Sequence, residues 1–328
     1  MEHPDGRPVD RKGRLSRRQA LKLAGGAGFA AIAGAWPRTA MAQTAPAVPN
    51  GGGFYRFRLG SYTITLLSDG QGVLPTFPGF AGNPDRRDAY ARFLLENFVD
   101  PDRFVNNFIP MVVDTGRNKV LVDSGNGPGG VPRGVGRVAT HLQFAGIRPD
   151  EIDTIFITHG HGDHYSGLTT ADRSPAFPNA RIVMGETEYN FWTTQANVAE
   201  GVRTNLVALR SRITLVGPNH EIVPGLSTVL TPGHTVGHMS VLVSSGSAAL
   251  MHFGDAGGHY LLSFRFPEHY LAFDADKELV VRTRREMFDR AAADRFMVVG
   301  YHFPWPGLGY VRRKETYFEF VPAPFTLI

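Results

Sequence analysis

The segment 158–164, which reads THGHGDH, limits the folds open to this chain. It begins at the end of a short apolar stretch, residues 154–158, whose composition predicts a buried strand. Glycines after a strand let the backbone turn tightly, so that alternate side chains converge on one point. Imidazole nitrogens and carboxylate oxygens are the ligands that zinc and neighbouring transition metals prefer. The segment therefore predicts a metal site at the carboxyl end of a buried strand.

Further candidate ligands stand at the ends of other apolar segments, where functional sites on a sheet scaffold usually gather. The chain contains no cysteine, so histidine and carboxylate side chains must hold any transition metal. The seven candidates are His159, His161, Asp163, His164, His234, Asp255 and His302. A catalytic zinc ion typically takes three protein ligands. This set therefore predicts two divalent metal ions, with zinc as the expected element, sharing a bridging carboxylate and a water.

The order and context of these motifs resemble the metallo-β-lactamase superfamily, and within it the methyl parathion hydrolase family with its lactonase-like relatives. The resemblance extends beyond the metal motifs to the segments 55–56, 66–70, 121–125, 177–180, 191–192, 223–225, 233–235, 306–309 and 320–322. It implies an α/β fold, a four-layer αββα sandwich with a binuclear site at one edge of its two sheets. By the same resemblance one metal is held by His159, His161 and His234. The second is held by Asp163, His164 and His302, and Asp255 bridges the two.

Such a site predicts a metal-dependent hydrolase. Two cations lower the pKa of a bridging water, and the resulting hydroxide attacks a carbonyl carbon or a phosphorus. Asp255, as the bridge, and Asp163, as a carrier of a proton to the leaving group, are the expected catalytic carboxylates. The expected substrate is a small neutral ester, a lactone or aryl ester. Organophosphate triesters are expected as a side activity, because the loop 126–131 lacks the bulky aromatic residue of organophosphate-hydrolysing relatives.

Two other functions within the superfamily remain open. One is an all-histidine type of metallo-β-lactamase, and the other is a non-hydrolytic iron redox protein. Nucleic acid is not an expected partner. The net charge of +4 is concentrated in residues 1–42, whose eight basic and three acidic side chains leave the remainder at −1. A nucleic-acid-binding protein needs a basic face to neutralise phosphates.

The amino-terminal 42 residues predict an export signal. Residues 16–22 (SRRQALK) resemble the twin-arginine motif, an apolar run follows at 23–36, and Ala40-Met41-Ala42 forms an A-x-A cleavage site. The run is too short for a stable membrane anchor, because a spanning helix needs about 20 apolar residues. We expect cleavage after Ala42, a single hydrolase domain at 43–328, and a periplasmic or secreted protein. A homodimer is implied by the resemblance alone.

The remaining elements and nearby polar residues complete the prediction. Residues 54–67 predict a strand or hairpin, 71–83 a Pro/Gly-rich loop, and 85–98 and 277–293 helices. Several polar residues are expected to support the site rather than bind metal. These are Asp69 and Asp123 as turn or supporting residues and His238 as a non-ligand. Pocket walls are expected from Trp192 and Trp305, with His259 and His269 as further candidates.

Overall fold

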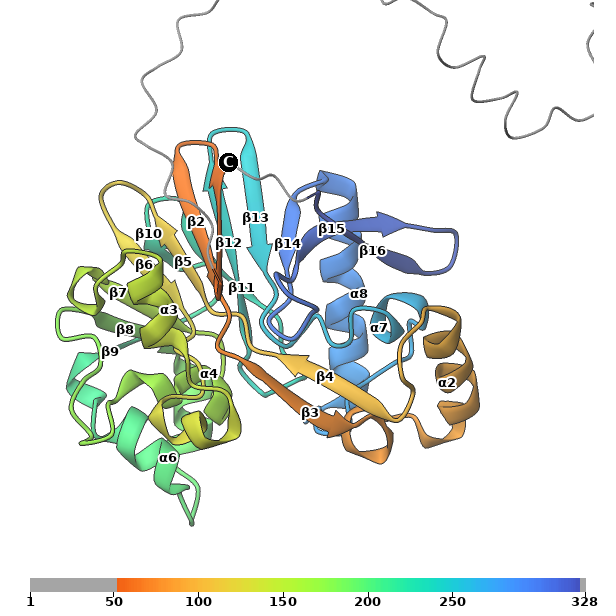
Figure 1. The fold of residues 1–328 in the computed structure, drawn as a ribbon, viewed down its shortest axis with the longest axis horizontal. Helices are drawn as coiled ribbons and strands as arrows, with labels where there is room; N and C mark the ends of the chain where they lie inside the picture. Colours follow the sequence, from red (N-terminus) through yellow and green to blue (C-terminus); the bar gives the residue numbers. More distant parts are fainter. Residues whose placement is uncertain (1–51, 325–328) are drawn as a thin grey trace, which may run out of the picture. The chain divides into compact units, whose positions relative to one another are not determined.

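The computed structural model describes residues 52–324. The predicted export signal at 1–42 and its cleavage site lie outside the described residues. Two seven-stranded mixed sheets form the centre of the described part (Figure 1). The first sheet contains β1 (Phe54–Leu59), β2 (Tyr62–Leu67), β5 (Met111–Asp114), β6 (Lys119–Val122), β7 (Thr154–Ile157), β8 (Arg181–Gly185) and β9 (Ile213–Val216), in that order. The second contains β10 (Glu221–Val223), β11 (Leu226–Leu230), β12 (Met239–Ser245), β13 (Ala248–His252), β14 (Met297–Val299), β15 (Leu308–Arg313) and β16 (Phe318–Pro322).

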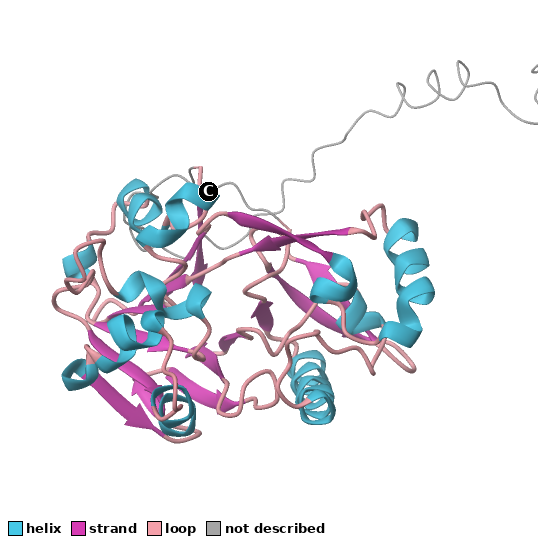
Figure 2. Cartoon of the chain, turned by 90° about the horizontal axis from the view of Figure 1, so that it is seen from below, coloured by secondary structure: helices cyan, strands magenta, loops and turns pink. Residues whose placement is uncertain are grey.

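Helices surround the two sheets (Figure 2). They are α2 (Arg87–Glu96), α3 (Val138–Phe144), α4 (Gly162–Tyr165), α5 (Glu186–Thr193), α6 (Glu200–Val202), α7 (Leu262–Arg265) and α8 (Lys277–Asp294). Of these, α3 and α5 pack on the first sheet and α8 on the second. Between residues 52 and 324, no helix combines the length and the apolar character needed to cross a membrane. The predicted helix at 277–293 is confirmed as α8, where the Asp276 side chain accepts a hydrogen bond from the Leu279 N–H and so caps its first turn.

Strand alternation explains why the layers stack in this order. Successive side chains on a strand point to opposite faces, so each buried strand supplies two cores. In β7, Phe156 joins the core between the two sheets, whereas Ile155 joins the core beneath α3 and α5. In β13, Leu250 faces the first sheet and Met251 packs toward α8. The result is a helix–sheet–sheet–helix arrangement, which confirms the predicted four-layer αββα sandwich.

A separate two-stranded antiparallel sheet corrects one expectation. The segment 71–83 was predicted to be a loop, but β3 (Gln71–Pro75) pairs antiparallel with β4 (Arg103–Asn107). Glycine and proline disfavour strands in general, yet Pro75 stands at the end of an edge strand and Gly72 faces Asn106 across the pair. The pairing partner lies about thirty residues further along the chain, so local sequence could not reveal it. This two-stranded sheet extends below the two large sheets toward α2 in Figure 1.

Strand direction places the functional loops at one edge. In the second sheet, β12 runs antiparallel to both β11 and β13, and β14 runs parallel to β13. The strands β11, β13 and β14 therefore point the same way, and their carboxyl ends meet at one edge of the sheet. The loops that follow them contain His234, Asp255 and His302.

Candidate metal centre

The segment 158–164 brings four candidate ligands to this edge from the first sheet. It follows β7 directly, and Asp163 and His164 lie in the short helix α4. Gly160 is required by packing, because a Cβ at this position would collide with the Trp192 ring. The turn thus depends on glycine for close approach. The structure brings together all seven residues that the sequence singled out, in two adjoining groups.

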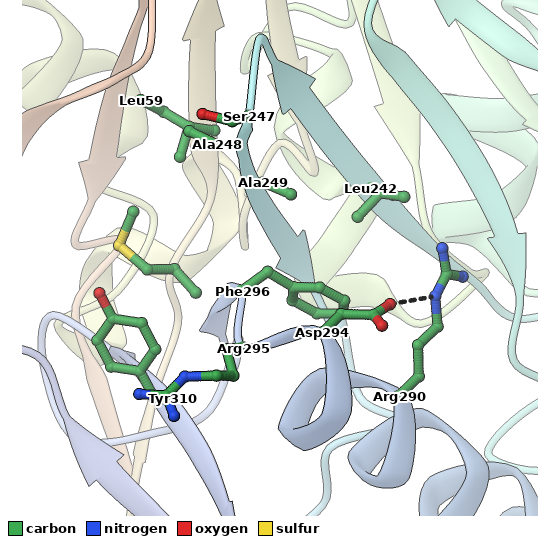
Figure 3. Close-up of a pocket in the computed structure, with 11 residues that line it drawn as sticks. Leu59, Leu242, Ser247, Ala248, Ala249, Arg290, Asp294, Arg295, Phe296 and Tyr310 are labelled. Carbon is green, nitrogen blue, oxygen red and sulfur yellow. Dashed lines mark ion pairs between the residues drawn. The ribbon is translucent and has the colours of Figure 1, made fainter.

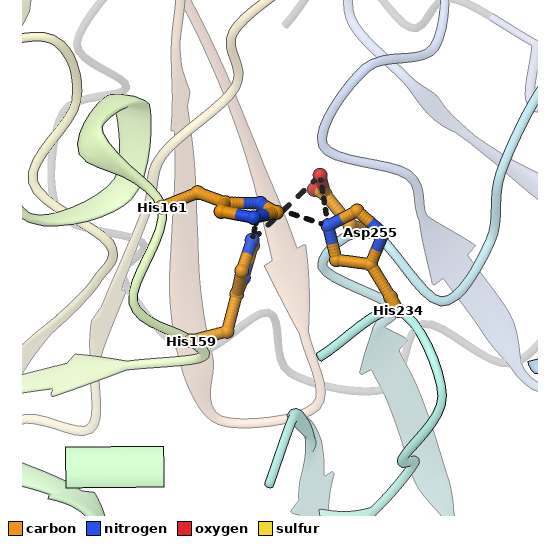
Figure 4. Close-up of side chains that lie close together, drawn as sticks. All are labelled: His159, His161, His234 and Asp255. Carbon is orange, nitrogen blue, oxygen red and sulfur yellow. Dashed lines mark hydrogen bonds and ion pairs between the residues drawn. The ribbon is translucent and has the colours of Figure 1, made fainter. Parts of the chain in front are cut away.

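The first group consists of His159, His161, His234 and Asp255 (Figure 4). The Nδ1 atom of His161 lies 2.9 Å from Nε2 of His159 and 3.0 Å from Nε2 of His234. Asp255 Oδ2 lies 3.2 Å from Nε2 of His234 and 3.8 Å from Nε2 of His159. Three imidazole nitrogens and a carboxylate oxygen therefore point at one another. A bound cation would satisfy this arrangement, since neutral imidazole lone pairs repel when they converge.

The second group consists of Asp163, His164 and His302. Asp163 Oδ2 lies 3.5 Å from Nε2 of His164 and 3.4 Å from Nε2 of His302. Asp255 also borders this group, with Oδ2 3.1 Å from Nε2 of His302 and Oδ1 3.3 Å from Nε2 of His164. Within the described residues, His164 Nε2 and Asp255 Oδ1 are buried without a hydrogen-bond partner. Buried polar atoms are normally paired, so these atoms and the donor set fit divalent metal ions.

Hydrogen bonds on the far side of the rings fix four of the histidines. Each ring donates its Nδ1–H to an oxygen and leaves Nε2 free to face the site, which is how metal-binding histidines are usually oriented. The pairs are His159 with Thr158 Oγ1 (3.0 Å), His164 with Asp123 (2.8 Å), His234 with Asp274 (2.7 Å) and His302 with the Asn107 carbonyl (2.7 Å). The supporting role predicted for Asp123 matches this geometry. Asp274 and Asn107 were not identified from the sequence.

Burial and neighbouring charges shift the pKa values of the site residues in different directions. Burial lowers the pKa of His161 to about 4. Burial also opposes charge on His234, but Asp255 and Asp274 outweigh it and raise the pKa of His234 to about 9. Burial would raise the pKa of Asp163, yet His164 and His302 lower it to about 2. Metal ions must displace protons from such a site, because imidazole binds metal in its neutral form.

Two buried residues near the centre, His238 and Asp69, use their side-chain atoms in hydrogen bonds to protein groups. The Asp255 N–H donates to His238 Nε2 (3.1 Å), and His238 Nδ1 pairs with Thr231 Oγ1 (2.8 Å). Both ring nitrogens of His238 are therefore used, as expected for a non-ligand. Asp69 accepts hydrogen bonds from the backbone N–H groups of Asn126 and Val138 and holds the loop beside the site. Its geometry is that of a structural carboxylate.

Glu188 on α5 connects two histidine-bearing loops, and no motif in the sequence points to this role. Its side chain is fully buried. Oε1 accepts hydrogen bonds from the Gly160 N–H (2.9 Å) and from Trp192 Nε1 (2.6 Å). Oε2 accepts from Thr235 Oγ1 (2.9 Å) and the Gly237 N–H (2.8 Å). Glu188 thus joins the loop of His159 and His161 to the loop of His234.

A cavity of about 530 Å³ opens over the cluster. Its lining comprises Asn106, Phe108, Asn126, Arg133, His161, Gly162, Asp163, Ser166, Asp255, Phe273 and His302. The aromatic walls therefore come from Phe108 and Phe273. Trp192 packs against His161, with ring centroids 5.5 Å apart, whereas Trp305 lines a different hollow. His259 and His269 are buried and are absent from the lining, as is Val131 of the loop 126–131.

Another hollow, of about 420 Å³, lies at the far end of the second sheet (Figure 3). It is bordered by Ala248 at the start of β13, and the candidate ligands follow the other end of that strand. Arg290 and Asp294 form an ion pair of 3.7 Å across its rim. No member of the two metal-binding groups lines it, so this hollow is separate from the candidate centre.

A sequence model of the metallo-beta-lactamase superfamily matches residues 110–297, more than half of the chain. The chain belongs to the metallo-beta-lactamase superfamily. The matched region contains six of the seven candidate ligands, and His302 follows it by five residues. The superfamily and the fold predicted from the sequence are thus confirmed.

Two of the curated relatives are N-acyl homoserine lactonases by name. The Bacillus cereus protein is 28% identical over 115 residues, which cover 35% of this chain and 42% of the relative. The Bacillus thuringiensis protein is 30% identical over 117 residues, which cover 43% of its length. The match therefore spans less than half of these relatives.

Solved structures match over a much larger share of the chain. AidC, described as a dizinc quorum-quenching lactonase in complex with the product N-hexanoyl-L-homoserine, is 26% identical with a TM-score of 0.76. The match covers 84% of this chain and 98% of AidC. The hydrolase AbOPH also has a TM-score of 0.76, at 23% identity, with coverage of 84% and 99%. At that identity the second likeness shows the fold alone.

Proposed function

We propose that this protein is a metal-dependent hydrolase that uses two divalent ions, with zinc as the expected element, to open lactones. The observation that carries the proposal is the convergence of seven donor side chains in two groups that share the Asp255 carboxylate. One ion would be held by His159, His161 and His234. The other would be held by Asp163, His164 and His302, with Asp255 between them. The dizinc lactonase AidC, similar over most of this chain, supports the choice of metal and reaction.

Divalent cations supply Lewis acidity, which lowers the pKa of a bound water and stabilises negative charge on a substrate oxygen. The protein contributes orientation and proton handling. Asp255 is 3% exposed, and its oxygens lie close to histidines of both groups. The Asp163 side chain keeps 24% of its surface exposed and lines the cavity, so it can reach a bound substrate. We assign it a proton relay: as a carboxylate with a low pKa it takes the proton released by the attacking water and passes it to the leaving oxygen.

The cavity supports a small, largely neutral substrate. Its walls combine Phe108 and Phe273 with a few polar side chains, as is usual for sites that bind small molecules. Arg133 is its one cationic side chain among the described residues, and it is solvent exposed. A lactone suits this lining because ring opening needs no separate subsite for a departing group. Organophosphate triesters remain a proposed side activity, since both phenyl rings offer contacts to an aryl group.

We expect lactone hydrolysis to exceed methyl parathion hydrolysis in kcat/KM. Purified protein loaded with zinc would be compared on an N-acyl homoserine lactone, dihydrocoumarin, an aryl ester, methyl parathion and a cephalosporin. Both activities should fall together in His302→Ala, because one site serves both substrates. A wild-type preference for methyl parathion or for the cephalosporin would overturn the proposed substrate order. Loss of only one activity in His302→Ala would indicate two separate sites.

Export through the twin-arginine pathway is proposed on the sequence alone. The motif at 16–22 and the A-x-A site ending at Ala42 support it. This route carries folded proteins, so the metal ions could be bound before export. Replacing Arg17 and Arg18 together by lysine should leave uncleaved precursor in the cytoplasm, measured by cell fractionation and mass spectrometry of the amino terminus. Normal periplasmic processing of this double variant would contradict the assignment.

A further inference from the structure

One polar side chain in the cavity wall has no role in the centre described so far. Asn106 on β4 is 8% exposed and lines the cavity together with Asp163, Asp255 and His302. Its Oδ1 atom is buried and has no hydrogen-bond partner among the described residues. Asp255, which also lines the cavity, has an unpartnered buried oxygen too, but that atom belongs to a metal-binding group.

The β3–β4 pair shapes the surroundings of Asn106. Its partner across the pair is Gly72, which has no side chain to cover the amide. The ring of Phe108 lies 3.6 Å from the point where a Cβ on Gly72 would stand, so the floor next to Asn106 is apolar. The following residue, Asn107, accepts the Nδ1–H of His302 through its carbonyl oxygen. Asn106 is therefore adjacent in the chain to a residue that fixes the cluster.

A buried acceptor without a donor is unfavourable, and a ligand with a matching donor recovers the lost hydrogen bond. The polar groups of a simple lactone are its ring oxygen and carbonyl oxygen, which only accept. They gain nothing from a carboxamide oxygen. A lactone with an acylamino substituent beside its carbonyl adds one N–H donor close to the reacting carbon. That N–H is the group which Asn106 Oδ1 lacks.

We propose that Asn106 forms a substrate-binding subsite that accepts a hydrogen bond from the amide N–H of an N-acylamino lactone. The subsite rests on the proposed lactonase function and narrows its substrate class. It makes Asn106 a specificity residue that recognises the substituent and takes no part in the bond-breaking step. Sites that hydrogen-bond a substrate N–H discriminate against analogues that lack it, because the buried partner then stays unpaired.

The test uses the zinc-loaded protein and two lactones of the same size. One is γ-butyrolactone with a hexanoylamino substituent, and the other has CH₂ in place of the amide N–H. Wild type should prefer the amide by about tenfold or more in kcat/KM. Asn106→Leu should bring this ratio close to one by lowering turnover of the amide substrate alone. Asn179→Leu, at an exposed position absent from the cavity lining, should behave as wild type.

Stability separates this role from a structural one. Asn106 Oδ1 has no partner to lose, so Asn106→Leu should unfold at the same temperature as wild type or higher, and Asn106→Ala provides a second variant if leucine does not fit. Equal loss on both lactones, or a wild type without amide preference, would overturn the subsite while leaving lactone hydrolysis intact. Absence of turnover on either lactone would overturn the proposed function and this inference together.

Discussion

Asp255→Asn is expected to lose metal and to reduce hydrolysis by about a thousandfold or more. Metal-ion catalysis contributes several kcal/mol to transition-state stabilisation, and each 1.36 kcal/mol corresponds to a tenfold change in rate. Asparagine keeps the size of the side chain but removes its charge and one of its acceptor oxygens. The variant should therefore fold, yet hold fewer metal ions than wild type.

The size of this effect follows from the position of Asp255 between the two groups. Its Oδ2 atom lies within 3.2 Å of Nε2 of both His234 and His302, and its Oδ1 atom lies 3.3 Å from Nε2 of His164. Its two oxygens therefore lie close to histidines of both groups. A change at this residue therefore alters the environment of two ions, whereas a change at one histidine alters that of one.

Asp69→Asn is the matched control for this experiment. Asp69 is also a fully buried aspartate near the site, but its hydrogen bonds go to Asn126 and Val138 rather than to the donor set. This variant should lose stability and keep its metal. Metal content after gel filtration, measured by elemental analysis, decides the comparison. If Asp255→Asn retains as much metal as wild type, the assignment of Asp255 as the bridge is wrong.

The candidate ligands could be predicted because they are local features of the sequence. The segment 158–164 places four of them within seven residues, and His234, Asp255 and His302 each follow a recognisable apolar strand. A strand end fixes where a side chain lies relative to the sheet edge. The αββα layers followed from the same strand pattern combined with the family resemblance.

The supporting residues could not be predicted because their roles depend on distant contacts. Asp274 lies forty residues from His234, and the loop that contains it has no motif. Asn107 acts through its backbone carbonyl, which every residue possesses. Glu188 stands in a short helix among exposed polar residues, where a glutamate would be expected to face solvent. The two-stranded sheet of β3 and β4, which carries Asn106, depends on a pairing across about thirty residues.

Glu188→Gln is expected to weaken metal binding by about 10- to 100-fold, the usual effect of changing a residue that orients metal ligands. All four of its partners are donors: two backbone N–H groups, the indole N–H and a threonine hydroxyl. A carboxylate has only acceptors and satisfies all of them. Glutamine has the same shape but turns an NH₂ group toward two donors, so those hydrogen bonds are lost. The free energy of unfolding should fall by about 2–4 kcal/mol.

Glu186→Gln is the matched control on the same helix. Glu186 is exposed, so the same chemical change there should leave metal affinity and stability as in wild type. Metal affinity would be measured by competition with a chromophoric chelator, and unfolding would be followed with and without metal. If Glu188→Gln lowers stability but binds both ions as wild type does, Glu188 supports the fold without setting the site.

The position of Glu188 also predicts which ion is affected more. Its hydrogen bonds reach the loops of His159, His161 and His234, which form the first group with Asp255. Glu188 makes none of the hydrogen bonds that hold the second group, since His164 is held by Asp123 and His302 by the Asn107 carbonyl. The chelator titration of Glu188→Gln should therefore separate into two steps, with one equivalent released at a much lower chelator concentration than the other. Equal weakening of both equivalents would show that the two groups respond as one unit, coupled through Asp255.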